Sequence, residues 1–446
     1  MHIRMSTDKI QLFTYFIAIC LLGSFLLSCP FSYESKIPVP YIDALFLSVS
    51  AVCVTGLSTV DMRLFSVTGF LVIMGLIELG GLGIITFVSL YIAVPKRRMT
   101  LVNRAVVREF FIEDVEVEPK SILRSIILFT VGIEMICAIL LIPEFQREGS
   151  SRPVLDAAFH SVSAFCNAGF STYQDSLCPF AGNFAIQAII MVLIVSGGIG
   201  FTVLTDISRR FILRKRARMS FHSRMVLTVT AILILLSVAL IFLAERNASF
   251  TGLSTPQKLF ASLFSAITPR TAGFSVVPQD GFTPATNLLV MVLMFIGGSP
   301  GSIAGGIKTT TFMIVIIYAI RGNTERKGLN ILRRNIDTSV VEKAFSIFAK
   351  SLMILILALA LLLCTERSLL SAARFSAFDL FFEVVSAFGT VGLSLGVTPH
   401  LSMLGKLVII ATMFIGRTGI FAMALGFAHR EKEHLFEYPS ANVLVG

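Results

Sequence analysis

The chain has 446 residues, of which 55% are apolar and only 14% charged, and its mean hydropathy is +0.84. Soluble proteins carry charge on about a quarter of their residues, so this composition excludes a soluble globular protein and predicts a polytopic membrane protein. The net charge of +10 would suggest nucleic-acid binding in a soluble protein. Its distribution along the chain, given below, indicates a different role.

The first apolar run covers about residues 10–28 and follows the basic residues Arg4 and Lys9. It ends at Leu26-Leu27-Ser28-Cys29, a pattern also found in lipoprotein signal peptides. We interpret it as a membrane helix, because comparable runs recur at 122–142, 225–243 and 345–364. Each run is long enough to cross a hydrocarbon core of about 30 Å as a helix.

Each of these runs is followed by a shorter apolar segment and then by a second long run. The short segments, 43–53, 156–166, 256–268 and 379–389, are too short to cross and are predicted to be re-entrant half-helices. Asp43, Asp156 and Asp379 are predicted to be N-caps, and in the third segment the predicted cap is Thr255, followed by Pro256 in the first helical turn. The second long runs, 67–94, 183–213, 285–320 and 403–427, are predicted to cross the membrane, each interrupted by a glycine cluster.

A related turn follows each half-helix: a Ser-Ala pair, then a glycine, one large apolar residue and a serine. The serine-to-glycine distance is 6 residues in three copies and 8 in the third, which carries the extra Pro269-Arg270. The four glycines are Gly56, Gly169, Gly273 and Gly392. Four copies at intervals of about a quarter of the chain predict four repeats.

The predicted repeats cover 1–95, 121–213, 222–320 and 344–430, with linkers at 96–120, 214–221 and 321–343 and a C-terminal tail at 431–446. The loops joining repeats hold 21 Lys and Arg residues, whereas the loops leading into the half-helices hold 7. Positive charge accumulates on the cytoplasmic side of membrane proteins. The linkers, the tail and both termini are therefore predicted to be cytoplasmic, and no nucleic acid is predicted to bind.

Because each predicted repeat crosses the membrane twice, all four enter it with the same orientation. Inverted repeats with a midplane site require an odd number of crossings, whereas parallel repeats can surround one axis. The predicted fold is an all-α polytopic membrane protein. Its four parallel repeats, with eight transmembrane helices and four re-entrant pore helices, surround a central pseudo-fourfold pore.

The four turns provide chemistry suited to a cation. An ion that enters hydrocarbon loses its hydration and needs replacement oxygens, which backbone carbonyls supply where glycine permits unusual backbone angles. Each half-helix also points its negative dipole end at the turn. The predicted ion-binding residues are Val54, Thr55, Gly56, Asn167, Ala168, Gly169, Thr271, Ala272, Gly273, Thr390, Val391 and Gly392. The structural alternative is a set of ordinary turns at helix ends.

The fourth copy, Thr390-Val391-Gly392-Leu393, resembles the potassium-channel filter signature. Four such hairpins on one chain resemble the Trk/Ktr/HKT potassium transporter superfamily, and within it the potassium-translocating subunits of bacterial Ktr systems. The resemblance implies potassium uptake through a channel-like selective pore in the inner (plasma) membrane, with Gly56 favouring potassium over sodium. It further implies a homodimer on a cytoplasmic nucleotide-binding ring of KtrA type, with no tightly bound cofactor. It leaves sodium activation open.

A glycine-rich insertion, 299–308, follows Gly298 in the third repeat. It lacks the Walker spacing of a phosphate loop, so we interpret it as a flexible plug below the filter, where the superfamily has its gating loop. Arg417 replaces a glycine of the fourth cluster and is predicted to put positive charge in the cation path. The alternative is that Arg417 pairs with Glu78 or Glu134. The predicted gate comprises Gly298, Ser299, Pro300, Gly301, Ser302, Gly305, Gly306, Lys308 and Arg417.

The remaining reactive residue types form no recognisable site. The seven cysteines show no metal-ligand spacing and are predicted to be core residues, and the six histidines are scattered. We therefore predict no enzymatic activity and no metal other than potassium at the filter. Asp61 and Asp175 are candidates for concentrating cations at the outer mouth, with ordinary loop acids as the alternative. The competing functional hypothesis is a symporter that couples potassium to sodium or protons.

Overall fold

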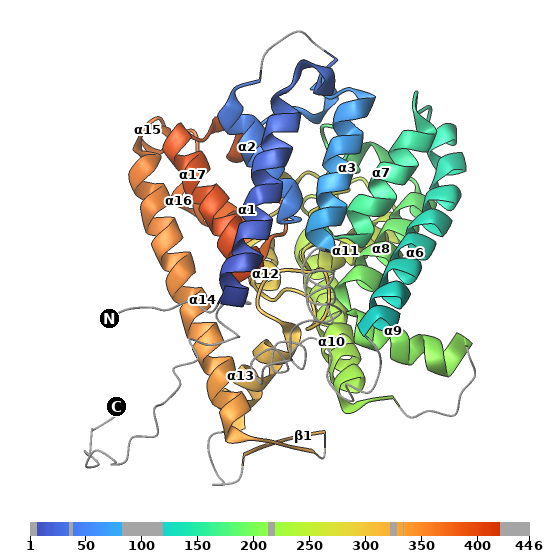
Figure 1. Cartoon of the computed structure of the whole chain (residues 1–446), viewed down its shortest axis with the longest axis vertical. Helices are drawn as coiled ribbons and strands as arrows, with labels where there is room; N and C mark the ends of the chain where they lie inside the picture. Colours follow the sequence, from blue (N-terminus) through green and yellow to red (C-terminus); the bar gives the residue numbers. More distant parts are fainter. Residues whose placement is uncertain are drawn as a thin grey trace.

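The computed structural model describes residues 7–34, 39–82, 119–212, 219–321, 328–332 and 334–419, and this part of the chain is almost wholly helical (Figure 1). Most of the predicted linker 96–120 and the whole tail 431–446 lie outside the described residues. Four long helices begin the predicted repeats: Thr7–Ser28 (α1), Pro119–Arg147 (α6), Phe221–Glu245 (α10) and Thr338–Thr365 (α14).

Three of these helices, Arg124–Arg147 within α6, α10 and α14, are single helices long and apolar enough to cross a membrane. Their outward faces carry large exposed apolar side chains, such as Met135 on α6, Leu235 on α10 and Met353 on α14. Contiguous exposed apolar surface of this kind is stable against lipid rather than water. The prediction of eight crossings remains a prediction, because the other apolar helices among the described residues are shorter or bent.

The short helices are Tyr41–Val52 (α2), Pro153–Phe165 (α7), Thr255–Ile267 (α11) and Ala377–Gly389 (α16). They form the centre of the hydrophobic core, and each buries at least one phenylalanine completely. The core thus lies around the segments that precede the four turns, and the long helices surround it.

The predicted N-caps of the short helices are wrong. The N-caps are Pro40, Arg152, Ser254 and Ser376. Asp379 is instead the third residue of α16, where it completes a capping box with Ser376. Each aspartate lies in the first turn of its helix, where a negative charge is still favourable. The aspartates therefore mark the beginnings of these helices correctly, but each helix begins a few residues earlier than predicted.

Later helices follow the turns: Val67–Gly81 (α3), Phe184–Gly198 (α8) with Phe201–Ile207 (α9), Pro284–Phe295 (α12) with Thr309–Arg321 (α13), and Met403–Phe414 (α17). Short 3₁₀ turns precede four of them, at Met62–Leu64, Cys178–Phe180, Gln279–Gly281 and Thr398–His400, and another at Pro30–Ser32 follows α1. Buried carboxylates bind the N-cap residues of two of these helices, α12 and α17. Glu245 Oε1 accepts a hydrogen bond from the Thr283 N–H at 3.1 Å, and Glu366 accepts one from the Ser402 N–H at 3.2 Å.

The later helices are interrupted at their glycine clusters. The chain bends by 110° between α8 and the segment Phe201–Arg210, at Gly200, whose φ is +89°. The described helix after α12 resumes only at Thr309. The segment Ser208–Ile212 and the end of α17, Ile415–Gly419, form π-helical turns, which often accompany functional sites.

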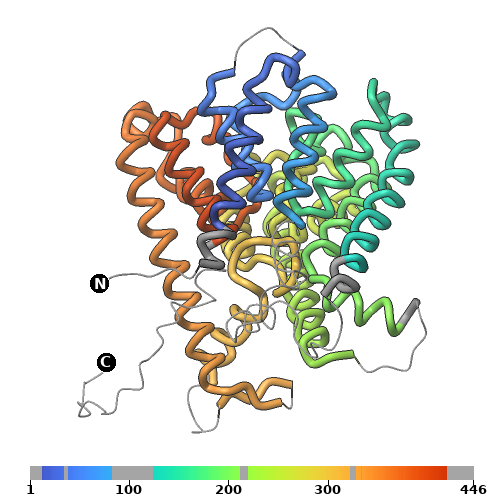
Figure 2. The backbone as a smooth tube through the Cα atoms, viewed as in Figure 1, coloured from blue at the N-terminus to red at the C-terminus, as the bar shows by residue number. Residues whose placement is uncertain are grey.

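The packing of the helices closes a cycle. Helix α3 packs on α7, α8 on α11, α12 on α16, and α17 on α2, which returns to the start of the chain. Within this frame the segment between α12 and α13 lies centrally in the view of Figure 2, between the long helices α14 and α10.

One element departs from the all-helical prediction. Leu329–Ile331 (β1) and Arg334–Ile336 (β2) form an antiparallel hairpin in the region predicted only as a linker. The hairpin lies at the end of α14 that is lowest in Figure 1. Ile331 is buried with Val341 of α14 and Val315 of α13, so apolar side chains hold the hairpin against two helices. A short helix, Arg367–Ser371 (α15), follows α14.

Candidate functional site

The four turns share one backbone conformation. Their first residue and their glycine both have positive φ, and the residue between them does not. The values are 57° and 94° for Val54 and Gly56, 56° and 72° for Asn167 and Gly169, 71° and 74° for Thr271 and Gly273, and 50° and 95° for Thr390 and Gly392. Alternation in the sign of φ turns successive peptide carbonyls toward the same side, which is the arrangement that a ring of carbonyl ligands requires.

This conformation is strained, which makes its recurrence informative. Val54, Thr271 and Thr390 are β-branched residues, for which positive φ is a genuine outlier. Each such residue costs on the order of 1–3 kcal/mol and persists only where its surroundings impose it. Seven non-glycine residues of the described chain have positive φ, and four of them occupy this one position of the turns.

Hydroxyl groups of the short helices hold the turns. Ser50 Oγ accepts from the Gly56 N–H and Ser386 Oγ accepts from the Gly392 N–H, both at 3.1 Å. In the other two turns the hydroxyl donates to the carbonyl after the glycine: Ser163 to Phe170 at 2.8 Å, and Thr268 to Phe274 at 2.6 Å. Thr268 thus replaces the serine that the two inserted residues of the third copy have displaced.

The four turns meet one another in a closed ring. A Cβ built on any of the four glycines would lie less than 3.0 Å from the carbonyl oxygen that precedes the glycine of the next turn. The contacts are Gly56 with Ala168, Gly169 with Ala272, Gly273 with Val391, and Gly392 with Thr55. Glycine is therefore required at all four positions both by φ and by space, and the structure brings the twelve predicted ion-binding residues together.

Several polar side chains in the ring have no hydrogen-bond partner among the described residues. The hydroxyls of Thr55, Thr271 and Thr390 are buried and unpaired. Buried polar groups are normally satisfied, so these three hydroxyls require a partner that the described residues do not supply. The amide of Asn167 lies instead against Gly197 and Gly198 of α8.

The segment between α12 and α13 folds back beneath the turns and is held by backbone hydrogen bonds. Gly297 N–H donates to Ile307 O at 2.9 Å, and Thr309 N–H donates to Gly298 O at 3.0 Å, which closes the segment on itself. Ser299 N–H donates to Gly198 O at 3.0 Å, and Gly301 O accepts from Phe201 N–H at 3.1 Å. The predicted gate residues 298–302 therefore contact the bend between α8 and α9.

The other end of this segment approaches the ring. A Cβ on Gly305 would overlap the hydroxyl of Thr390, and one on Gly306 would lie 3.0 Å from Gly297. Lys308 Nζ donates to Ala304 O at 2.6 Å. Gly305 can therefore reach its position directly under the fourth turn only because it has no side chain.

Arg417 is buried and bonded to backbone carbonyls. Its guanidinium donates to Ile303 O, to Gly80 O at 2.9 Å and to Gly81 O at 3.3 Å, while its Nε has no hydrogen-bond partner in the described chain. Its hydrogen-bond partners are therefore backbone carbonyls and not Glu78 or Glu134, the partners considered in the alternative prediction. They tie the fourth repeat to the end of α3 and to the 296–308 segment.

Asp61, predicted to lie at the outer mouth, behaves in part as an ordinary loop residue. Asp61 forms an ion pair with Arg63 at 2.7 Å, and hydrogen bonds from the Arg63 guanidinium lower the pKa of the Asp61 carboxyl. Its charge is thus partly compensated locally.

Sequence comparison assigns the chain to a family. The model of the TrkH family, described as cation transport protein, matches residues 1–438. The chain belongs to this family. "Ktr system potassium uptake protein B" of Bacillus subtilis is 36% identical over 451 residues, covering 100% of this chain and 98% of that protein. "Potassium/sodium uptake protein NtpJ" of Enterococcus hirae is also 36% identical, covering 100% and 99%.

The fold agrees with a solved member of the family. The potassium transporter TrkH from Vibrio parahaemolyticus matches with a TM-score of 0.73 over 94% of this chain and 84% of that chain, at 19% identity. The predicted superfamily, a helical membrane protein and transport rather than catalysis are confirmed by these matches.

Sequence reasoning missed some residues of the site. The serines of three Ser-Ala pairs were recognised as markers without their role as hydrogen-bond partners of the turns, although their shared spacing of 6 residues from the glycine was the available signal. Arg270, in the insertion of the third turn, is buried and donates to Thr230 Oγ1 at 3.2 Å. Nothing in the sequence distinguished it from a loop cation.

Proposed function

We propose that this protein takes up potassium ions across the plasma membrane through a channel-like pore on the axis of the four turns. The observation that carries the proposal is the closed ring of four glycines and carbonyls in one repeated, strained conformation. The relatives named as potassium uptake proteins support the choice of ion. In this proposal four parallel repeats, with the boundaries predicted above, surround the pore, and their linkers and both termini are cytoplasmic.

The selectivity filter consists of the twelve residues of the four turns. Their carbonyls, together with the free hydroxyls of Thr55, Thr271 and Thr390, replace the hydration shell of a potassium ion. The first turn carries Gly56 rather than a residue with a side chain, and the contact of that position with Ala168 O leaves no room for one. All four quadrants therefore offer similar ligands, which favours one ion size.

The gate consists of the 298–308 segment and Arg417. The segment fills the centre below the ring, and its bonds to α8, α9 and Arg417 hold it there. The positive charge of Arg417 raises the energy of a cation beneath the filter. Opening requires these few backbone bonds to exchange, which the glycines of the segment make sterically possible.

The protein acts as a homodimer with a cytoplasmic nucleotide-binding subunit of KtrA type. Support comes from the naming of its relatives as parts of a Ktr system. The hairpin β1–β2, which packs on α13 and α14, and the basic linkers offer surfaces on the proposed cytoplasmic side.

A reversal-potential measurement in proteoliposomes tests the proposed pore against the competing symporter. The symporter hypothesis is supported by the name of one relative, the potassium/sodium uptake protein NtpJ. A potassium gradient is imposed, with sodium and proton gradients varied independently. A pore reverses at the potassium equilibrium potential whatever the other gradients are. A reversal potential that shifts with the sodium or proton gradient at fixed potassium contradicts the proposal and supports coupling.

A further inference from the structure

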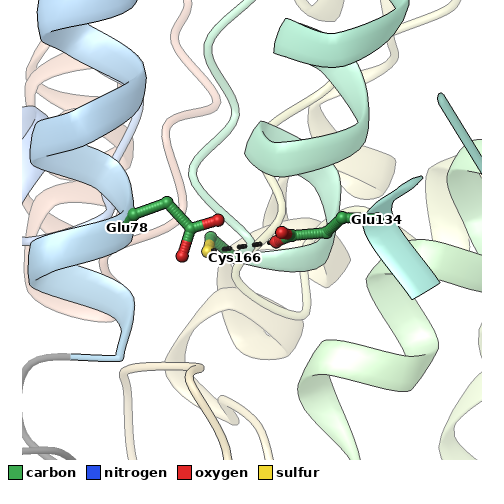
Figure 3. A group of neighbouring side chains, drawn as sticks. All are labelled: Glu78, Glu134 and Cys166. Carbon is green, nitrogen blue, oxygen red and sulfur yellow. Dashed lines mark hydrogen bonds between the residues drawn. The ribbon is translucent and has the colours of Figure 1, made fainter. Parts of the chain in front are cut away.

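One buried carboxyl group, one half-buried carboxyl group and one buried thiol meet outside the proposed pore. Glu78 comes from α3, Glu134 from α6, and Cys166 is the C-cap of α7, and their ligand atoms all lie within 4.8 Å of one another. Figure 3 shows the Cys166 sulfur between the two glutamates. The three residues are far apart in sequence, which is why no spacing pattern revealed them.

The surroundings of this cluster, Glu78, Glu134 and Cys166, demand a positive charge. Glu134 is 6% exposed and Cys166 is fully buried. Glu78 is half-buried. Two ionised carboxylates this close together repel each other, and the C-terminal end of α7 adds further negative potential. The guanidinium of Arg417 bonds to backbone carbonyls and does not neutralise the pair.

The thiol decides between the possible cations. A proton shared by the carboxyls would satisfy them but would leave the buried thiol without a role. The Cys166 thiol has one contact, to Glu134 Oε1 at 3.9 Å, which is long even for sulfur. Sulfur together with carboxylate oxygens is a ligand set for zinc-like divalent cations and not for potassium or magnesium.

A candidate for a fourth ligand, Thr130, comes from α6. Thr130 lies one helical turn before Glu134, on the same face, and its hydroxyl is buried without a hydrogen-bond partner in the described part of the chain. Ser161 of α7 donates to Glu134 O at 2.7 Å and fixes the two helices against each other at this level. The ligands thus come from packed helices rather than from a loop.

We propose that Glu78, Glu134 and Cys166, with Thr130, form a binding site for a zinc-like divalent cation. The site is separate from the filter but adjoins the proposed gate. Gly81, three residues after Glu78, lies between Cys166 and Ile303: a Cβ there would be 3.0 Å from the Cys166 sulfur and 3.3 Å from the Ile303 side chain. Because Gly80 O and Gly81 O accept from Arg417, a cation that clamps α3 to α6 and α7 holds the closed arrangement and inhibits flux.

The test uses Co²⁺ as a spectroscopic probe on the purified full-length protein in detergent, with Zn²⁺ as competitor. The parent should bind one Co²⁺ per chain with a sulfur-to-cobalt charge-transfer band, which Zn²⁺ abolishes. Cys166→Ser should abolish the band, and Glu134→Gln should weaken binding by about tenfold or more. Cys53→Ser is the matched control, because Cys53 is the buried C-cap of α2 and should leave the band unchanged.

Absence of the band in folded parent protein overturns the site, as does a band that persists in Cys166→Ser or disappears in Cys53→Ser. Thermal unfolding of each variant establishes that it is folded. Zn²⁺ inhibition of potassium flux is measured separately in proteoliposomes. Because the absorption readout requires no transport, failure of the metal site and failure of the proposed pore are distinguishable.

Discussion

The ring of turns and the region directly beneath it are built in opposite ways. In the ring, hydrogen bonds run within each repeat, between a hydroxyl of the short helix and its own turn; the Gly56 N–H, for example, donates to Ser50 Oγ. Beneath it, further hydrogen bonds join different repeats: Ser299 to Gly198, Phe201 to Gly301, and Arg417 to Gly80. The ring repeats one conformation four times, whereas below it the chain bends at Gly200 after α8, leaves the helix after α12 and forms a π-helical turn at Ile415–Gly419 after α17.

This difference follows from what each region is proposed to do. An ion on the axis requires equivalent ligands from all sides, so each repeat must form its turn independently and identically. A gate requires at least two arrangements, closed and open. Hydrogen bonds between repeats can exchange partners when the repeats move relative to one another. The asymmetry is concentrated in the segment 296–308 and in Arg417, the two places where the third and fourth repeats depart from the common pattern.

Breaking the ring should have the largest effect. Gly392→Ala places a Cβ against Thr55 O, in a backbone with φ of +95°, and should abolish potassium flux. Gly396→Ala is the matched control: its φ is +86°, but a Cβ there meets nothing within 4 Å. Potassium uptake at matched membrane levels distinguishes the two. Equal uptake by both variants would contradict a ring that depends on close approach.

Removing the bonds between repeats should raise flux. Arg417→Gln removes a charge whose repulsion of a cation could reach about 4 kcal/mol at 4 Å and an effective dielectric of 20, and it removes contacts to Ile303 O and Gly80 O. Uptake should rise severalfold in a potassium-uptake-deficient strain.

Shortening the 298–308 segment should have the same direction of effect and should weaken regulation by any cytoplasmic partner. Gly305 of this segment lies against Thr390 of the fourth turn, so in the proposed gate the loss of the segment removes a steric block. Uptake at or below that of the parent, with regulation intact, would locate the gate elsewhere.

Weakening the bonds within one repeat should have an intermediate effect. Ser386→Ala removes the acceptor of the Gly392 N–H, and an unsatisfied buried donor costs roughly 1–3 kcal/mol. Potassium-over-sodium selectivity should decrease while the protein still folds. Ser371→Ala, which removes an exposed hydroxyl that donates to Ser368 O at 3.1 Å, should change neither selectivity nor thermal stability. If Ser386→Ala behaves like this control, the hydroxyl does not hold the turn.

The outer loop should matter least. The ion pair with Arg63 lowers the pKa of Asp61, so the pair stabilises the protein above the unfolded pKa of an aspartate and loses this effect as pH falls through the lowered folded value. The pair is exposed, and such pairs contribute little. Asp61→Asn should change potassium flux less than about twofold, with the difference vanishing at high salt. A larger change would make Asp61 part of the cation path.

The sequence predicted most of the ring because its requirements are local. Positive φ and close approach leave only glycine at Gly56, Gly169, Gly273 and Gly392, so the pattern is visible in a single chain. The starts of α2 and α7 were misplaced because Asp43 and Asp156 are favourable anywhere in a first turn, and only the coordinates show where the helix begins.

Contacts between repeats could not be predicted in the same way. Arg417 was recognised as an unusual charge, but whether it pairs with a glutamate or with carbonyls depends on how three segments pack. Glu78, Glu134 and Cys166 are 32 or more residues apart in sequence, and each appeared to be an isolated core or membrane residue. The hairpin β1–β2 could not be predicted because its few apolar residues form no recognisable pattern alone and are buried only by packing on α13 and α14.

Whether the four turns form one cation site is tested by the anomalous scattering of Tl⁺ or Rb⁺ in crystals of this protein. These ions replace potassium and are located without reference to the protein's own density. We expect anomalous peaks on the axis between Gly56, Gly169, Gly273 and Gly392, at distances from the surrounding carbonyls that suit a dehydrated ion. An intact ring with no peak on the axis, while the ions bind elsewhere in the same crystal, would contradict this expectation.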